Sequence, residues 1–118
     1  MVQEPSAEAV AGARKQVCPH FHAAIELVGR RWSGAIISAL TDGPCRFGEL
    51  NAAVPRLSDR LLSQRLRELE TAGLVERKVV AGTPTKVTYS LTAKGADLDP
   101  ALRELHEWGQ RWNASAAG

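Results

Sequence analysis

The chain has 118 residues, of which 44% are hydrophobic, so it is long enough for one folded domain and too apolar for a disordered segment. The net charge of +2 is small, so a nucleic acid partner would have to be recognised by a local cluster of basic residues. No apolar run approaches the ~20 residues of a membrane span, and two cysteines, Cys18 and Cys45, are too few for a disulfide scaffold. No signal-peptide pattern is present, so we expect a cytosolic protein with reduced cysteines and no membrane association.

The N-terminal residues 1–16 contain Pro, Gly, Ser and many Ala, and they predict an arm that precedes a single domain over residues 17–118. Within the arm, Glu8–Gln16 is a weak helix candidate. A first apolar stripe at helical spacing then predicts a core helix, which Gly29 ends. The stripe consists of Phe21, Ala24, Ile25 and Val28.

Two further stripes predict the next two helices. The first comprises Trp32, Ala35, Ile36, Ala39 and Leu40, and the second comprises Phe47, Leu50 and Val54. A strong turn signal over residues 41–44, Thr-Asp-Gly-Pro, separates them. The short third helix should end before Pro55, because proline disrupts the backbone hydrogen bonds of a helix interior.

The fourth predicted helix, from about Arg60 to Ala72, has two chemically opposite faces. Ser58 stands where an N-cap would lie, and Gly73 closes the helix. The apolar face carries Leu62, Leu66 and Leu69. The polar face carries Arg60, Ser63, Gln64 and Arg67. Guanidinium, hydroxyl and carboxamide groups are the side chains that read base edges in a major groove, although such a face can also simply be solvated.

Two alternating segments with basic residues follow, over residues 75–80 and 86–91, and they predict a β-hairpin whose tip is 81–85. Helix, turn, helix and basic hairpin is the order of a winged helix-turn-helix. The predicted fold is therefore mainly α with a small β-hairpin wing and terminal dimerisation helices.

The last segment carries an apolar stripe that ends in two tryptophans. Its members are Leu98, Leu102, Leu105, Trp108 and Trp112. A new helix could begin at Asp99-Pro100, but the stripe stays in phase across Pro100, so we favour one kinked helix. An amphipathic terminal helix with two tryptophans favours an interface, and we expect Leu102, Leu105, Trp108 and Trp112 to hold a homodimer.

An ordered set of motifs from about Val17 to Trp112 resembles the HxlR family of bacterial transcription regulators. The motifs are Cys18-Pro19, Glu26 to Trp32, Asp42 to Leu50, Leu61 to Val75, Tyr89 to Gly95, Trp108-Gly109 and Arg111-Trp112. The resemblance implies a cytoplasmic, homodimeric winged helix-turn-helix protein that binds double-stranded operator DNA with two inverted half-sites. The stretch Arg30 to Gly34 departs from the family's common Gly-Lys-Trp-Thr form, and its small residues could leave a gap for a ligand beside Trp32.

The residues that we expect to contact DNA fall into two groups. The recognition helix contributes Ser58, Arg60, Ser63, Gln64 and Arg67. Three cations, Arg31, Arg46 and Lys86, could contact phosphates, which position a protein without specifying sequence. Arg65 lies at the flank of the helix and should meet either a phosphate or an acid such as Glu68 or Glu70.

Many members of the family respond to electrophiles or oxidants through a cysteine just before the first core helix, where this chain has Cys18. The basic neighbours Arg14, Lys15 and His20 would favour a thiolate if they lay close in space. The alternatives are an inert packed thiol, or a regulator that answers to a small ligand. Cys45 follows a turn and is expected to be a packing residue.

Other functions find less support in the sequence. The alternating Cys18, His20 and His22 lead into a helix, where positions two apart diverge, so we expect no metal site and no cofactor. The sequence shows no set of nucleophile, base and orienting group that would indicate an enzyme. A winged-helix module that binds only protein remains the alternative, and salt-dependent binding of operator DNA would separate the two.

Overall fold

The computed structural model describes residues 16–113 of the chain. Contacts within the chain divide it into two compact units, one ending at Arg30 and the other beginning at Arg31. The predicted arm over residues 1–16, including the weak helix candidate Glu8–Gln16, lies outside the described residues except for Gln16.

The first unit contains one described helix, α2 (Pro19–Val28), which ends at the predicted glycine, with Gly29 as its C-cap. None of the residues from Pro19 to Val28 is buried, and Phe21 and Ile25 are 59% and 46% exposed. The helix itself is confirmed, and its packing into the core stays a prediction. An apolar stripe shows that a helix has a face to bury, but it does not show which surface covers that face.

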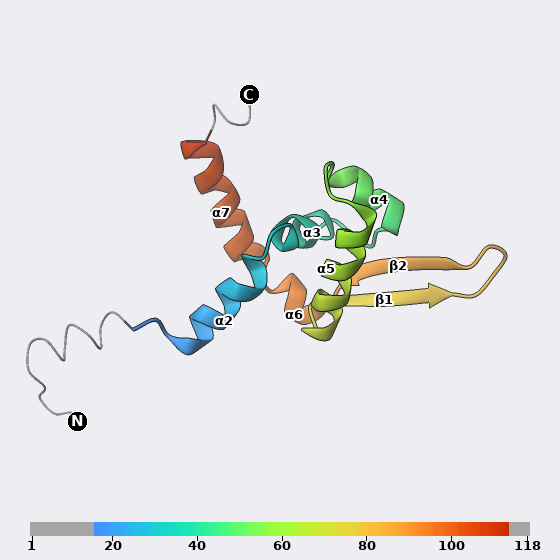
Figure 1. The fold of residues 1–118 in the computed structure, drawn as a ribbon, viewed down its shortest axis with the longest axis horizontal. Coiled ribbons are helices and arrows are strands. Elements are labelled where there is room, and N and C mark those ends of the chain that lie inside the picture. Colours follow the sequence, from blue (N-terminus) through green and yellow to red (C-terminus); the bar gives the residue numbers. More distant parts are fainter. Residues whose placement is uncertain (1–15, 114–118) are drawn as a thin grey trace, which may run out of the picture. The chain divides into compact units, whose positions relative to one another are not determined.

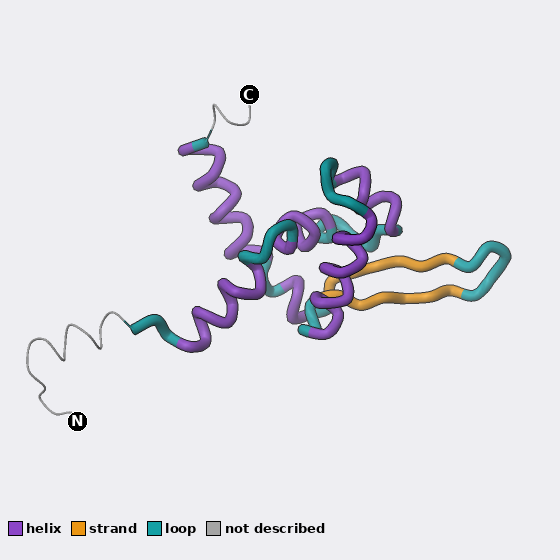
Figure 2. The backbone as a smooth tube through the Cα atoms, viewed as in Figure 1, coloured by secondary structure: helices purple, strands orange, loops and turns teal. Residues whose placement is uncertain are grey.

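The second unit is mainly α with one antiparallel hairpin, as predicted (Figures 1 and 2). Its elements are α3 (Ser33–Ala39), α4 (Phe47–Ala53), α5 (Asp59–Thr71), β1 (Val75–Val80), β2 (Lys86–Leu91), α6 (Ala93–Ala96) and α7 (Asp99–Trp112). None of the helices between residues 16 and 113 has the length and apolar character needed to cross a bilayer. Figure 1 shows the hairpin extending beyond the helices to its free tip.

The core of this unit lies between the inner faces of α3, α4 and α5. Its fully buried side chains are those of Ile36, Ile37, Leu40, Leu50, Leu62, Leu66, Leu69 and Leu74. The three predicted stripes of α3, α4 and α5 therefore all contribute to the core, because apolar residues three and four apart share one side of a helix.

Both predicted boundary residues of α5 are confirmed. The Ser58 hydroxyl accepts a hydrogen bond from the Leu61 backbone N–H at 3.1 Å and so caps the first turn. At the other end, Gly73 has a φ of +81°, and the Leu74 N–H donates to the Leu69 carbonyl at 2.9 Å. This is a left-handed glycine cap, and it turns the chain directly into β1.

The hairpin pairs Val75 with Leu91 at its base and Val80 with Lys86 near its tip. A third segment joins the base of the hairpin, because Cys45 and Tyr89 exchange two backbone hydrogen bonds of 2.9 and 2.8 Å. Cys45, two residues before α4, is therefore tied to β2, which joins the wing to the helix-turn-helix.

The prediction of one kinked terminal helix is wrong, because α6 and α7 are separate helices. The hydroxyl of Thr92 accepts from the Gly95 N–H at 3.1 Å and starts α6, while α7 begins at Asp99 with Pro100 in its first turn. Pro100 has no N–H to donate to the Ala96 carbonyl, so the helical ladder breaks between them. The stripe remains in phase because Asp97 and Leu98 keep right-handed helical backbone angles.

A close approach at Gly95 provides a test of this packing. A Cβ added to the buried Gly95 would lie 2.2 Å from the Leu74 carbonyl oxygen, which is a rigid backbone atom. We expect Gly95→Ala to lower the free energy of unfolding by about 1–3 kcal/mol, measured by urea denaturation. The control is Ala96→Gly at an exposed position of the same helix, which should cost about 1 kcal/mol or less. An unchanged midpoint in Gly95→Ala would contradict the packing.

Candidate nucleic-acid interface

Helices α4 and α5 form a helix-turn-helix, and contacts on both sides of the turn set the angle between the two helices. Val54 and Leu57 are buried in the turn, and the Asn51 side-chain amide donates a hydrogen bond to the Asp59 carboxylate at the start of α5. The second helix is thereby held rigidly against the first. A recognition helix needs this rigidity, because base contacts depend on its position to within a fraction of an ångström.

The outward face of α5 carries the side chains predicted to read DNA. Arg60, Gln64 and Arg67 are exposed, and Ser63 is half-buried. Within residues 16–113, neither the Arg60 nor the Arg67 guanidinium has a hydrogen-bond or ion-pair partner. Gln64 makes a long hydrogen bond of 3.4 Å to Glu68. The face therefore presents two guanidiniums whose hydrogen-bonding groups remain available to a ligand.

Arg65 points the other way and belongs to the fold. The residue is only 9% exposed; its Nε donates to the Arg31 carbonyl at 2.9 Å, and its Nη1 lies 3.2 Å from a Glu68 carboxylate oxygen. Of the two predicted partners, the acid is confirmed. The guanidinium thus ties Arg31, two residues before α3, to α5, and its positive charge is already paired.

A groove of about 430 Å³ lies between α5 and the hairpin, and the sequence interpretation missed one of its cations. Its lining residues are Ser63, Leu66, Arg67, Glu70, Arg77 and Tyr89. Arg77 lies opposite Tyr89 in the strand register, so it faces the same groove as Arg67. The alternation of side chains along β1 indicates this position for Arg77, because it places Arg77 on the same side of the strand as the buried Val75.

The four remaining predicted DNA contacts lie outside the polar face of α5, at separate places in the chain. The Arg31 guanidinium lies 5.2 Å from the centre of the Trp32 ring. Arg46 is exposed at the start of α4, where its backbone N–H donates to the Glu49 carboxylate at 2.7 Å. Lys86 is exposed at the first position of β2. Ser58 uses its hydroxyl to cap α5, so its side chain is already partnered.

The two cysteines have different surroundings. Cys18 is exposed at the N-cap position of α2, while its neighbours Arg14 and Lys15 lie outside the described residues. Burial raises the pKa of the Cys45 thiol, and the carboxylates of Glu49 and Asp42 raise it further. Cys45 therefore holds less thiolate than a free cysteine at the same pH, as expected of a packing residue. Within residues 16–113, no three His, Cys, Asp or Glu side chains are grouped so that they could hold a metal ion.

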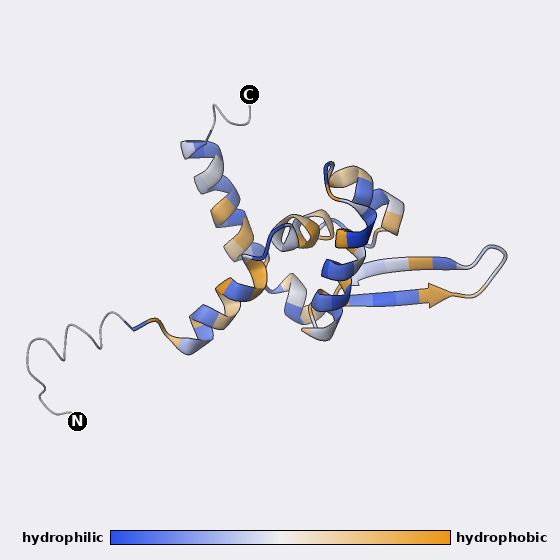
Figure 3. Cartoon of the chain, in the orientation of Figure 1, coloured by the Kyte–Doolittle hydropathy of each residue, from blue (hydrophilic) through white to orange (hydrophobic). Residues whose placement is uncertain are grey.

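The apolar stripe of α7 is exposed in the single chain. Leu105, Trp108 and Trp112 are 61%, 51% and 68% exposed, and Leu102 is half-buried. Figure 3 shows hydrophobic and hydrophilic residues alternating around this helix. Large apolar side chains that are exposed together typically mark a surface for association.

Comparison with known proteins identifies relatives for most of the chain. Residues 27–117 match the family described as HxlR-like helix-turn-helix. Two proteins of Bacillus subtilis named HTH-type transcriptional regulators are 43% identical to it. The match with YvaP, named as uncharacterised, covers 84% of this chain and 92% of YvaP, and that with YodB covers 81% and 86%.

Solved structures agree with the fold. The reduced form of YodB from Bacillus subtilis has a TM-score of 0.74 at 42% identity, covering 82% of this chain and 95% of YodB. The redox regulator HypR in its oxidised form has a TM-score of 0.75 at 37% identity, covering 80% of this chain and 96% of HypR. YodB has also been crystallised after diamide treatment and with a quinone bound.

Proposed function

The chain belongs to the HxlR-like helix-turn-helix family and is a helix-turn-helix transcriptional regulator, and we propose that it acts as a cytoplasmic homodimer on an inverted-repeat operator. One observation carries the assignment of the reading surface. Helix α5 buries its leucines and Arg65 while it exposes Arg60, Gln64 and Arg67 on the other side. An exposed row of this chemistry on the second helix of a helix-turn-helix suits insertion into a major groove.

The phosphate-binding part of the proposal rests on cations that flank α5. Arg31, Arg46 and Lys86 are exposed, and Arg77 shares the groove beside Arg67. Such cations supply affinity that falls steeply with salt, whereas the side chains on α5 supply the sequence preference. Nothing in this role requires catalysis, and we propose no enzymatic activity.

The experiment that tests this function selects DNA with the purified protein from a random pool and sequences the bound fraction. We expect an inverted repeat whose half-sites are about one helical turn apart, because two copies of α5 must enter the major groove on one side of the duplex. Binding of the selected DNA should weaken with rising salt. Selection without any enriched sequence would favour a module that binds only protein.

We propose Cys18 as the residue that senses electrophiles or oxidants. It is exposed at the start of α2, whereas the thiolate of Cys45 is disfavoured by burial and by two carboxylates. Treatment with diamide or a quinone should lower the operator affinity of the parent protein by at least about ten-fold, and Cys18→Ser should prevent this loss. An electrophoretic mobility shift with and without reagent measures both.

Cys45→Ser is the matched control, and it should release DNA as readily as the parent after treatment. If the Cys18→Ser variant released DNA after treatment as readily as the parent, Cys18 would not be the sensor. If the parent itself kept its DNA in both reagents, the regulator would answer to something other than thiol chemistry.

A further inference from the structure

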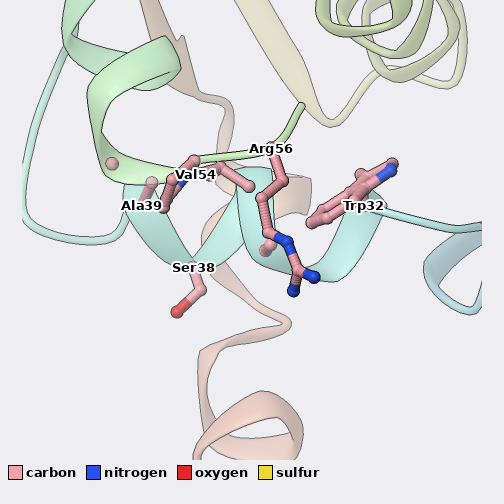
Figure 4. Close-up of a pocket in the computed structure, with 8 residues that line it drawn as sticks. Trp32, Ser38, Ala39, Val54 and Arg56 are labelled. Carbon is pink, nitrogen blue, oxygen red and sulfur yellow. The ribbon is translucent and has the colours of Figure 1, made fainter. Parts of the chain in front are cut away.

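A pocket of about 490 Å³ lies beside α3, at the position where the sequence suggested a gap (Figure 4). One side is formed by Trp32, Ala35, Ser38 and Ala39, and the other by residues 53–56 at the end of α4 and in the following turn. Its volume lies within the range of pockets that bind small molecules in proteins. Apart from Trp32 and Arg56, its lining side chains are small or apolar.

Two unusual backbone conformations meet at this pocket. Trp32 has a φ of +78° and Arg56 a φ of +79°, and among residues 16–113 they are the only non-glycine residues with a positive φ. Side chains with a Cβ atom rarely adopt this left-handed region. Both residues line the same pocket, and such strained conformations concentrate at sites that hold ligands.

The chemistry of the two large side chains defines what the pocket can hold. Trp32 supplies a flat indole, and the small side chains of the alanines that line the pocket leave space beside it. Within the described part of the chain, the Arg56 guanidinium has no hydrogen-bond or ion-pair partner. Figure 4 shows the Arg56 side chain extending between Trp32 and Ser38. A second guanidinium, that of Arg31, lies 5.2 Å from the centre of the indole.

We propose that this pocket binds a small planar aromatic carboxylate. Its ring lies against the Trp32 indole and the alanine side chains, and its carboxylate accepts the paired hydrogen bonds of the Arg56 guanidinium. No acidic side chain lines the pocket, so a cationic ligand would meet only positive charge there. An inorganic anion would leave the indole and the apolar lining unused.

The binding goes beyond the proposed function, because it needs no DNA. It is nevertheless placed where it could affect DNA affinity, since Val54 and Arg56 belong to the turn that ends two residues later at Ser58, the N-cap of α5. A ligand that binds one conformation of this turn more tightly than another would alter the affinity of the protein for its operator. DNA would then alter the affinity for the ligand by the same factor.

The test uses the full chain without DNA and 1-naphthoate as the probe. Titration is followed by ¹⁵N NMR of the indole N–H signals, which Trp32→Phe assigns, and by calorimetry. We expect the Trp32 signal to shift and saturate with one site per chain. The neutral naphthalen-1-ylmethanol and the non-aromatic cyclohexanecarboxylate should each bind at least about ten-fold more weakly, since each lacks one of the two contacts.

Arg56→Gly is the decisive variant, because glycine suits a φ of +79° and the fold should be at least as stable as in the parent. We expect it to weaken 1-naphthoate binding by at least about ten-fold. Arg111→Gln removes the same charge from an exposed position of α7 outside the pocket and should leave the affinity unchanged. Equal binding by Arg56→Gly, equal binding of the neutral alcohol, or shifts confined to the Trp108 and Trp112 signals would overturn the proposal.

Discussion

Replacing Arg67 or Arg60 with alanine is expected to lower operator affinity by at least about 30-fold while non-specific binding changes far less. Both guanidiniums are exposed on α5 and unpaired within the described residues, so each can form the two hydrogen bonds that recognise a guanine. One such pairing discriminates by about 1–3 kcal/mol, and the variant dimer would lack it at both half-sites. Fluorescence anisotropy with the selected operator and with a scrambled duplex measures the two affinities.

Lys86→Ala is the comparison for these variants, because Lys86 is proposed to bind a phosphate and not a base. It should weaken operator and scrambled DNA by similar factors and reduce the slope of log affinity against log salt by about 0.9 for each phosphate that the lysine neutralises in the parent complex. Arg65 is unsuitable as a control, since its buried guanidinium bonds to the Arg31 carbonyl and its removal would disturb the fold. If the Arg60, Arg67 and Lys86 variants each kept the full operator affinity of the parent, α5 would not be the reading helix.

Placing a charge in the apolar stripe of α7 should have the second large effect. Trp108→Glu introduces a carboxylate into the face that carries Leu105 and Trp112, and a buried unpaired charge is strongly unfavourable. We expect the variant to be a monomer by light scattering at a concentration where the parent is a dimer. Operator affinity should fall by more than about 100-fold, because a single subunit can occupy only one half-site.

Gln110→Glu is the matched control on the same helix. Gln110 is exposed and two positions from Trp108, so it lies on a different side of α7, and the same new charge should leave the dimer intact. Circular dichroism of the Trp108→Glu variant should still show the helical content of the parent, since residues 99–112 bury no side chain in the single chain. A parent protein that scatters as a monomer at tens of micromolar would contradict the proposed dimer.

Local chemistry was sufficient to predict much of this chain. Ser58 and Gly73 mark the two ends of α5 because a hydroxyl cap and a left-handed glycine act within one turn of the backbone. The leucines of α5 occupy the core because helical periodicity alone places them on one face. The polar face of the same helix follows from the same periodicity, so the residues proposed to read DNA were identifiable before any tertiary contact was known.

Other features depend on which segments meet in space, and the sequence does not encode these pairings locally. Arg65 looks like its basic neighbours on α5, yet it is buried, because the Arg31 carbonyl, 34 residues earlier in the chain, lies where its Nε can donate. Arg77 reaches the groove beside Arg67 only because β1 packs against α5. Likewise, periodicity shows that α2 and α7 have apolar faces, but their exposure in the single chain appears only in the structure. Periodicity is a property of one segment, whereas burial depends on the free energy of packing that segment against another.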